Sequence, residues 1–306
     1  MYCVIDIGSN TIRLVIFRQD AGILTPVLSS KTTAGLAGYV DKKNCLSREG
    51  IRRLISVLRK YRDVTAMLPD CPLYPFATAS LRNIVNTDQV LETVWRETGL
   101  GIQVLSGYEE AMLDYRGAIR RASLQSGILA DVGGGSTELV VFRDRTVLAA
   151  HSLPVGSLNL YSACVGDLIP KKKELREMRE KVCAMMRSAL PPVDGCLGQP
   201  LCGVGGTARA ALALYQNLNK ADGAAPAFYP RSFLDDVLAM AAGEPRKLMR
   251  RILKVAPERV HTLVPGILIL QCAAEIYQSE RIFTSPCGVR EGYLSFMLEK
   301  EGISCD

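Results

Sequence analysis

Metal-binding and disulfide patterns are scarce in this sequence. Among its 306 residues are only two histidines, and none of the ten cysteines forms a C-x-x-C pair. A structural zinc site needs closely spaced cysteines and histidines, so the sequence argues against a zinc protein. We expect the cysteines to be reduced, mostly buried thiols rather than a disulfide framework. His151 and His261 have no carboxylate or Ser/Cys motif nearby, and we expect both to be structural or solvated.

Long apolar runs and an export signal are also missing. The longest apolar stretch, "TLVPGILILQCAAEIY", is too short to cross a membrane and contains Pro265, Gly266 and Gln271. The N-terminus reads "MYCVIDIGSN", with neither a basic segment nor a signal-type apolar segment, so we expect a cytoplasmic protein without a membrane partner. The formal net charge of +6 suits a polyanionic ligand. No recognition motif accompanies that charge, so we do not expect DNA binding.

The length and the hydrophobic pattern indicate two α/β domains. A chain of 306 residues exceeds the usual size of one hydrophobic core. Apolar runs predict strands over residues 2–6 and 12–18, each followed by turn-forming residues. Apolar residues at helical spacing predict a helix with Ser47 as its N-cap and a later helix that ends at Gly99.

Two segments of the chain repeat one pattern. Residues 6–17 read "DIGSNTIRLVIF" and residues 131–142 read "DVGGGSTELVVF", and the two align without a gap at an offset of 125 residues. Each is an apolar strand that ends in Asp, followed by a turn of small residues and a second strand. Because the offset is close to a domain length, we interpret the repeat as an internal duplication. The predicted domains are residues 1–125 and 126–306.

The two repeated turns have the composition of anion-binding loops. Glycines let backbone N–H groups converge on one anion, and Ser9, Asn10, Thr11, Ser136 and Thr137 add side-chain donors. A third loop, "GVGGTARA", precedes an Ala-rich helix, and a helix N-terminus after glycines is a ready phosphate site. Each loop alone is equally compatible with an ordinary hairpin or packing turn. The repeated Asp favours phosphate binding for the pair.

With these motifs the chain resembles the exopolyphosphatase / guanosine pentaphosphate phosphohydrolase (Ppx/GppA) family. The resemblance rests on "DIGSNTIRLVIF", "SGYEEA", "DVGGGSTEL", "GVGGTARA" and the C-terminal "REG", in family order across the whole chain. It implies an α/β fold of two duplicated ribonuclease-H-like domains of the actin/Hsp70/sugar-kinase superfamily, with a phosphate cleft between the domains. The length resembles the short two-domain members. In this fold the last helix often packs back on the first domain.

The resemblance assigns acidic residues to catalysis and to Mg²⁺. It implies that Glu110, the second Glu of "EEA", is the general base. The residues alone leave another explanation open, because carboxylates also stabilise a helix N-terminus. Neighbouring helix positions diverge, so we interpret Glu109 as a structural neighbour. Asp131 and Glu138 are implied to hold Mg²⁺ or water, and Asp6 is their equivalent on the first hairpin, where a turn-capping role stays open.

The remaining predicted site residues contact phosphate. Arg82 matches a family arginine, with a solvated arginine as the alternative. The glycine loops are expected to supply the other contacts, from Gly8, Ser9, Asn10, Thr11, Gly133, Gly134, Gly135, Ser136, Gly205, Gly206 and Thr207. We interpret the lysine run at residues 171–173 as the polar face of an exposed helix, with a track for a polyanion as the alternative.

The expected function is hydrolysis of a phosphoanhydride. The resemblance implies release of terminal phosphate from inorganic polyphosphate or guanosine pentaphosphate by Mg²⁺-assisted attack of water. Relatives often carry Arg at Met112 and Asn159, and we expect the loss of these two charges to weaken polyphosphate binding or change the preferred substrate. A non-catalytic sensor of alarmone or polyphosphate and an ATP-dependent kinase of the same fold remain alternatives. The oligomeric state stays open, with a homodimer as one option.

Overall fold

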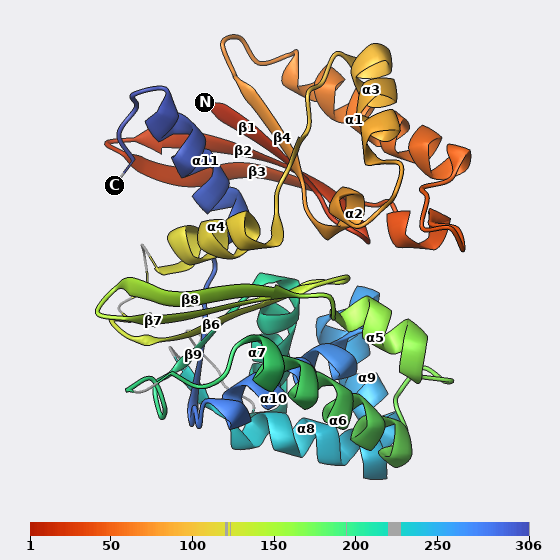
Figure 1. Ribbon diagram of the computed structural model, residues 1–306, viewed down its shortest axis with the longest axis vertical. Coiled ribbons are helices and arrows are strands. Elements are labelled where there is room, and N and C mark those ends of the chain that lie inside the picture. The colour runs from red at the N-terminus through yellow and green to blue at the C-terminus, as the bar shows by residue number, and fades with distance from the viewer. Residues whose placement is uncertain (120–121, 123, 194, 220–227, 306) are drawn as a thin grey trace. The chain divides into compact units, whose positions relative to one another are not determined.

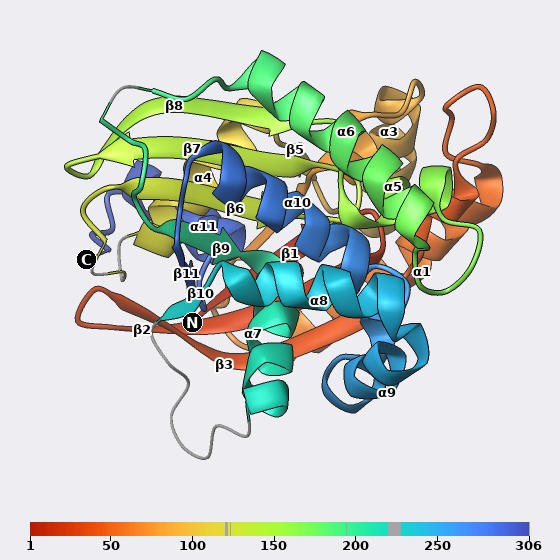
Figure 2. The same cartoon turned by 90° about the horizontal axis from the view of Figure 1, so that it is seen from below.

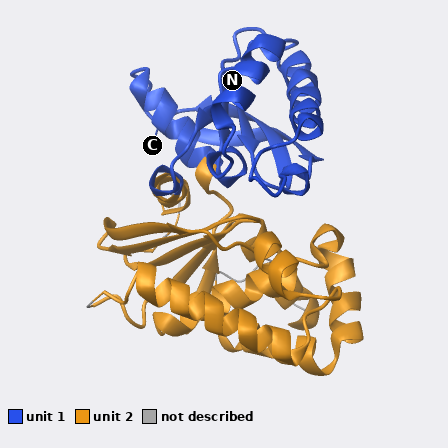
Figure 3. Cartoon of the chain, turned by 45° about the vertical axis from the view of Figure 1, so that its right-hand side comes forward, with its two compact units in different colours: residues 1–110, 290–306 blue, residues 111–289 orange. Residues whose placement is uncertain are grey.

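A computed structural model describes residues 1–306 apart from 120–121, 123, 194, 220–227 and 306 (Figure 1, Figure 2). The chain forms two compact units (Figure 3). Unit 1 comprises residues 1–110 and 290–306, and unit 2 comprises residues 111–289. Each unit contains one mixed β-sheet with helices packed on it, so the predicted α/β class is confirmed.

The unit boundary differs from the predicted boundary between residues 125 and 126. The chain passes from unit 1 to unit 2 inside helix α4 (Gly107–Ile119). The physical reason is that Ala111, Ala118 and Ile119 of α4 belong to a hydrophobic cluster with Leu129 and Val140 of the unit 2 sheet. The C-terminal segment, residues 290–306, belongs to unit 1.

The sheet of unit 1 has the strand order β3-β2-β1-β4-β5. β1 is antiparallel to β2 and parallel to β4, so a hairpin leads into a parallel crossover. The strands are β1 (Tyr2–Ile7), β2 (Thr11–Asp20), β3 (Ile23–Thr33), β4 (Leu73–Ala77) and β5 (Gln103–Val104). Two short helical segments are η1 (Leu36–Tyr39) and α2 (Ala79–Arg82).

Helices α1 (Arg48–Thr65) and α3 (Thr87–Thr98) cover one face of the unit 1 sheet. Alternate residues of β1, such as Ile5 and Ile7, share a hydrophobic core with Leu54 of α1 and Val90 of α3. Both helices have ends that the sequence predicts. The Ser47 side chain accepts a hydrogen bond from the Gly50 amide at 3.2 Å, and α3 ends at Gly99 with a φ of 69°.

Helix α11 (Val289–Lys300) covers the opposite face of that sheet. The rings of Phe76 in β4 and Tyr293 in α11 lie 4.6 Å apart, centroid to centroid. The Tyr74 hydroxyl donates to the Glu301 carboxylate at 2.9 Å. These contacts attach the C-terminal segment to strands near the start of the chain.

The sheet of unit 2 has the strand order β10-β11-β9-β6-β7-β8. Its strands are β6 (Gly127–Val132), β7 (Thr137–Arg143), β8 (Thr146–Leu153), β9 (Leu201–Val204), β10 (Phe228–Pro230) and β11 (Arg281–Thr284). Its helices after α4 are α5 (Ser157–Cys164), α6 (Lys172–Ala189), α7 (Gly205–Asn219), α8 (Ser232–Gly243), α9 (Pro245–Val255), η2 (Pro257–Arg259) and α10 (Leu263–Ile276). Almost every residue of α10 is buried, because this helix packs against α5, α6, α7 and α8 (Figure 2).

The internal duplication predicted from the sequence is present in the backbone. Asp6 pairs with Arg13 across β1 and β2, and Asp131 pairs with Glu138 across β6 and β7, at the same separation. β2 also shifts register against β3 after residue 16, and β7 shifts against β8 after the equivalent residue 141. In both units the first strand then pairs in parallel with a later strand, β4 or β9.

The cysteines of the chain are mostly buried. All ten cysteines are free thiols and most are buried, as expected. Two of them, Cys3 and Cys71, have sulfur atoms 3.0 Å apart. Within the described residues, no helix combines the length and the apolar character needed to span a bilayer.

Candidate active site

Glu110 and Arg82 form a largely buried ion pair in unit 1. Glu110 lies in the first turn of α4, and Arg82 is the last residue of α2. The Arg82 Nη1 donates to Glu110 Oε2 at 2.7 Å and to the Leu105 carbonyl at 3.1 Å. The two side chains are only 18% and 10% exposed, so Arg82 is not a solvated arginine. Charge-assisted bonds in such surroundings are strong and fix the carboxylate in one orientation.

Glu109 has a different task from Glu110. Its carboxylate accepts from the Ser106 amide at 2.7 Å, while its own amide donates to the Ser106 hydroxyl at 3.1 Å. This reciprocal arrangement is a capping box, which satisfies two amides at the start of α4. Glu109 is therefore structural, as the sequence indicates. By fixing the first turn of the helix, it also fixes the direction of Glu110.

The first glycine loop connects β1 and β2, directly after Asp6. The Gly8 amide donates to the Thr11 carbonyl at 3.0 Å and closes the turn. The Ser9 carbonyl accepts from Ala37, and the Asn10 carbonyl accepts from the amides of residues 34 and 35, all at 2.9 or 3.0 Å. In a planar trans peptide the C=O and N–H groups point in opposite directions. The N–H groups of Asn10 and Thr11 therefore point away from the segment around η1.

The second glycine loop is held by the N-terminus of α5. The Gly133 carbonyl accepts from the Ser157 amide at 2.8 Å. The Gly134 carbonyl accepts from the amides of Leu158 and Asn159 at 2.9 and 3.1 Å. The same peptide geometry turns the following N–H groups, those of Gly134 and Gly135, away from α5. Successive N–H groups that face one side make a concave anion site.

Asn159 joins this loop to α5 through both atoms of its side-chain amide. Its Oδ1 accepts from the Gly156 amide at 2.7 Å, and its Nδ2 donates to the Gly135 carbonyl at 2.9 Å. The second bond also turns the Ser136 N–H away from α5. A Cβ on Gly156 would lie 2.5 Å from the backbone of Gly134, so only glycine allows this close approach. The sequence interprets Asn159 as a lost positive charge, but the structure shows that it anchors the loop.

The predicted metal ligands of unit 2 face one side of its sheet. Asp131 and Glu138 are directly opposite in the antiparallel β6–β7 pair, so their side chains share a face, which is the face covered by α4. Glu138 is 1% exposed and its Oε1 accepts from the Ser152 hydroxyl at 2.7 Å. Within the described residues, no cluster of three or more Cys, His, Asp or Glu can hold a metal alone. Mg²⁺ needs only one or two carboxylates when phosphate and water oxygens complete its shell, so this pair fits it.

The third glycine loop begins α7. Gly205 has a φ of 79°, and a Cβ there would collide with the Asp131 carboxylate. The Thr207 hydroxyl donates to the Val132 carbonyl at 2.9 Å and ties the start of α7 to β6. The guanidinium of Arg259 in η2 occupies the space that a Cβ on Gly206 would need. A helix N-terminus and an arginine both favour an anion at this position.

Sequence reasoning missed two charged residues near these loops. One is Arg259, which belongs to no motif and reaches the third loop only through the fold. The other is Asp114, one helical turn after Glu110 in α4 and fully buried. Burial, and then the charge of Asp114, raise the pKa of the Cys202 thiol to about 12. The signal for Asp114 was its four-residue spacing from Glu110.

Comparison with known proteins identifies the family. Residues 15–301 match the model of the Ppx/GppA phosphatase family. The chain belongs to this family of phosphohydrolases. Exopolyphosphatase 1 of Mycobacterium leprae (strain TN) is 27% identical over 97% of this chain and 89% of its own length. Exopolyphosphatase 1 of Mycobacterium tuberculosis (strain ATCC 25618 / H37Rv) is 28% identical over 97% of this chain and 88% of its own.

Solved structures agree with the fold of this Ppx/GppA family member. The crystal structure of the Aquifex aeolicus family member superposes with a TM-score of 0.77 at 26% identity, over 99% of both chains. An exopolyphosphatase from Cytophaga hutchinsonii superposes with a TM-score of 0.82 over 99% of this chain and 98% of its own, and at 19% identity it supports the fold alone. The predicted actin-like fold class is confirmed.

Proposed function

We propose that this protein is an exopolyphosphatase, which releases terminal phosphate from inorganic polyphosphate by attack of water. The observation that carries the proposal is the Glu110 carboxylate, held at 2.7 Å by the Arg82 guanidinium. A fixed carboxylate beside a cation is what a phosphohydrolase needs to orient water and to balance phosphoryl charge. The relatives named exopolyphosphatase 1 support the choice of substrate.

In this mechanism Glu110 accepts a proton from the attacking water. The water oxygen bonds to the terminal phosphorus, the bond to the bridging oxygen breaks, and the shortened chain leaves with the electron pair of that bond. Arg82 holds Glu110 in position, and its positive charge offsets charge on the phosphoryl oxygens. Because little covalent chemistry falls to the protein, the rate depends on positioning and electrostatics.

The glycine loops bind the oxygens of the phosphate chain in this proposal. The outward N–H groups of Gly134, Gly135 and Ser136 act as donors, and those of the first loop add to them. At the third loop the N-terminus of α7 and Arg259 attract further negative charge. Asp131 and Glu138 would hold Mg²⁺, which supplies positive charge to the phosphoryl oxygens when it is bound. Asp6, on the first hairpin, remains a predicted ligand.

The test is phosphate release by purified protein with Mg²⁺. Long-chain polyphosphate, guanosine pentaphosphate and ATP are compared at equal concentrations of terminal phosphate. Release from polyphosphate at the highest kcat/KM supports the proposal. Faster release from guanosine pentaphosphate would make the alarmone the principal substrate. Tight binding of either compound without release would indicate a sensor, and phosphate transfer from ATP to an acceptor would indicate a kinase.

A further inference from the structure

A groove of about 1220 Å³ in unit 1 is lined by residues of α1 and α3. Figure 1 shows these two helices side by side. Four basic side chains line it, all exposed and all from α1: Arg48, Arg52, Arg59 and Lys60. The α3 side contributes neutral polar groups, Gln89 and Thr93 among them. None of the residues assigned to hydrolysis lines this groove.

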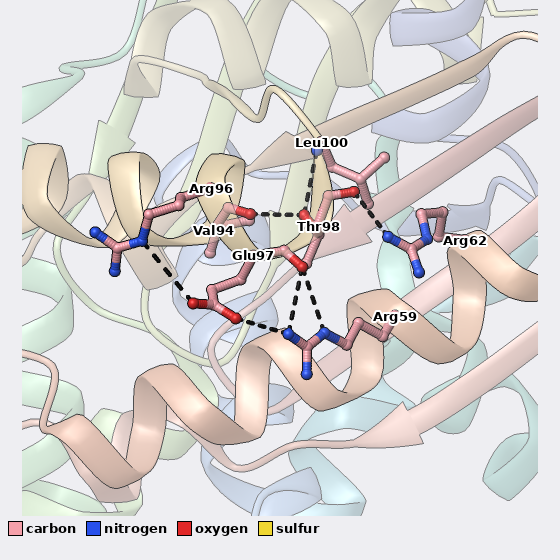
Figure 4. Close-up of polar contacts among 7 residues, drawn as sticks. All are labelled: Arg59, Arg62, Val94, Arg96, Glu97, Thr98 and Leu100. Atoms are coloured by element: carbon pink, nitrogen blue, oxygen red, sulfur yellow. Dashed lines mark hydrogen bonds and ion pairs between the residues drawn. The ribbon is translucent and has the colours of Figure 1, made fainter.

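The acidic groups of the groove are already neutralised. Its acidic lining residues are Asp63 and Glu97. Arg59 donates to Glu97 Oε2 at 2.7 Å, and Figure 4 shows the Arg59 side chain reaching from α1 to the end of α3. Arg62 pairs with Asp63 at 3.1 Å.

Three cations of the groove remain to attract a ligand. Among the described residues, none of the ion pairs within 4.0 Å involves Arg48, Arg52 or Lys60. The paired Arg59 lies beside them on the same wall. The groove therefore carries a net positive charge.

The basic side chains form a row along α1. Arg48, Arg52, Arg59 and Lys60 recur at spacings that keep them on one side of the helix, with Ser56 between them. At 1.5 Å per residue, the row from Arg48 to Lys60 is about 18 Å long. A linear polyanion can meet such a row at several points, whereas a single phosphate would use only one.

The lining favours a phosphate polymer without bases. Among the described residues that line the groove, none is aromatic, whereas sites for single-stranded nucleic acid stack bases on aromatic rings. Two apolar residues of the floor, Ile51 and Ile55, are only 9% and 8% exposed, and the exposed apolar side chain of the lining, Met67, comes after the C-terminal end of α1, so the stretch between the basic side chains offers little apolar surface to an amphipathic peptide. We propose that the α1–α3 groove is an accessory site for inorganic polyphosphate, which binds a stretch of the chain other than its terminal phosphate. The proposal rests on polyphosphate being the substrate of this protein.

An accessory site of this kind changes affinity and not chemistry. It should lower the KM for polymers long enough to occupy the groove while one end is hydrolysed. A short polyphosphate such as tripolyphosphate gains nothing from it. The kcat should be the same with and without the groove cations, because they do not touch the reacting phosphate.

The kinetic test reverses the charge of the unpaired cations. The variant Arg48→Glu/Arg52→Glu/Lys60→Glu is compared with Arg246→Glu/Arg250→Glu/Lys254→Glu, which changes the net charge equally along an exposed row of α9 in unit 2. We expect the groove variant to raise the KM for long-chain polyphosphate about tenfold or more, with kcat and the KM for tripolyphosphate within about twofold. The proposal fails if the control raises the KM equally, if tripolyphosphate is affected equally, or if neither KM changes.

A binding experiment separates this proposal from the hydrolytic one. Equilibrium binding of long-chain polyphosphate is measured at several salt concentrations, in the Glu110→Gln background with and without the groove reversals. The association constant K falls as the salt concentration rises, so log K plotted against log salt has a negative slope. Removing three cationic contacts should make this slope shallower by about two, because each contact contributes about 0.7 for a single-stranded polyanion.

An unchanged slope overturns the accessory site even if the protein hydrolyses polyphosphate. A groove-dependent slope in a protein that hydrolyses nothing retains the site and rejects the proposed function. Binding of poly-glutamate at this groove in preference to polyphosphate would make its ligand an acidic peptide and overturn the proposal.

Discussion

The Arg82 guanidinium donates from one nitrogen, Nη1, to both the Glu110 carboxylate and the Leu105 carbonyl. One cation therefore links the end of α2, the strand exit before α4 and the first turn of α4. The position of the carboxylate depends on this link and on the capping box that fixes the first turn of α4.

Arg82→Lys should reduce kcat while retaining the fold. Lysine keeps the positive charge and has three N–H donors, but its ammonium sits on a flexible stem without the rigid plane of the guanidinium, so it holds the carboxylate less firmly in one orientation. We expect kcat to fall by about tenfold to a hundredfold, with a smaller change in KM. Arg82→Met should also destabilise unit 1 by about 3 kcal/mol, because it removes the charge partner of a largely buried carboxylate. Steady-state kinetics and urea unfolding check the two statements. A wild-type kcat in Arg82→Lys would contradict the first, and a wild-type free energy of unfolding in Arg82→Met would contradict the second.

Gly156→Ala should displace the second glycine loop. The new Cβ would lie 2.5 Å from the Gly134 backbone, and backbone cannot move aside like a flexible side chain. We expect kcat/KM for polyphosphate to fall by about a hundredfold, because the loop amides lose their alignment. Gly243→Ala is the matched control, since nothing lies within 4 Å of a Cβ there. Equal activity in the two variants would show that the loop does not need its close contact with α5.

Asn159 variants should separate stability from activity. Asn159→Asp keeps an acceptor for the Gly156 amide and places a carboxylate at the start of α5, so its stability should stay within about 1 kcal/mol of wild type. It loses the donor to the Gly135 carbonyl and adds negative charge beside the loop, so its KM for polyphosphate should rise about tenfold. Asn159→Ala should be less stable than Asn159→Asp but bind polyphosphate better. Thermal unfolding and kinetics test the order, and parallel losses of stability and activity would refute it.

The Tyr74–Glu301 hydrogen bond should make stability fall in alkali. Burial, and then the bond to Glu301, raise the pKa of Tyr74 above its ordinary 10.0. The folded state therefore favours the neutral phenol. Its contribution is complete below about pH 10 and is lost as the pH rises from there through the folded-state pKa. Tyr74→Phe should show a shallower loss of unfolding free energy between about pH 9 and 12 than wild type. Identical slopes in urea unfolding would contradict this prediction.

The sequence predicts the local and repeated features of the fold. The alignment of residues 6–17 with 131–142 appears as two hairpins with the same register, because a register is set by the alternation of apolar residues and by the turn. Ser47 caps the start of α1 and Gly99 caps the end of α3, as predicted, because capping depends on neighbours in the sequence. Glu109 follows the same rule, because its capping partner is only three residues away.

Contacts between distant segments could not be predicted in this way. Asn159 holds a carbonyl 24 residues away, and this bond exists only because α5 is packed against the loop. Arg259 reaches Gly206 through the tertiary fold, with no motif to mark it. Asn86 is at the N-cap of α3, but its side chain bonds to both backbone groups of Leu46 instead of its own helix. Only the placement of the segments decides which of several partners a polar side chain finds.

The catalytic role of Glu110 is tested by phosphate release from long-chain polyphosphate by Glu110→Gln, paired with equilibrium binding of the same polymer. Glutamine retains the shape of the side chain and an acceptor for Arg82 but cannot take a proton from water. We expect release to fall by about a hundredfold to ten-thousandfold while the Kd stays within about threefold of wild type. Release at the wild-type rate from Glu110→Gln would contradict the role of Glu110 and the mechanism built on it.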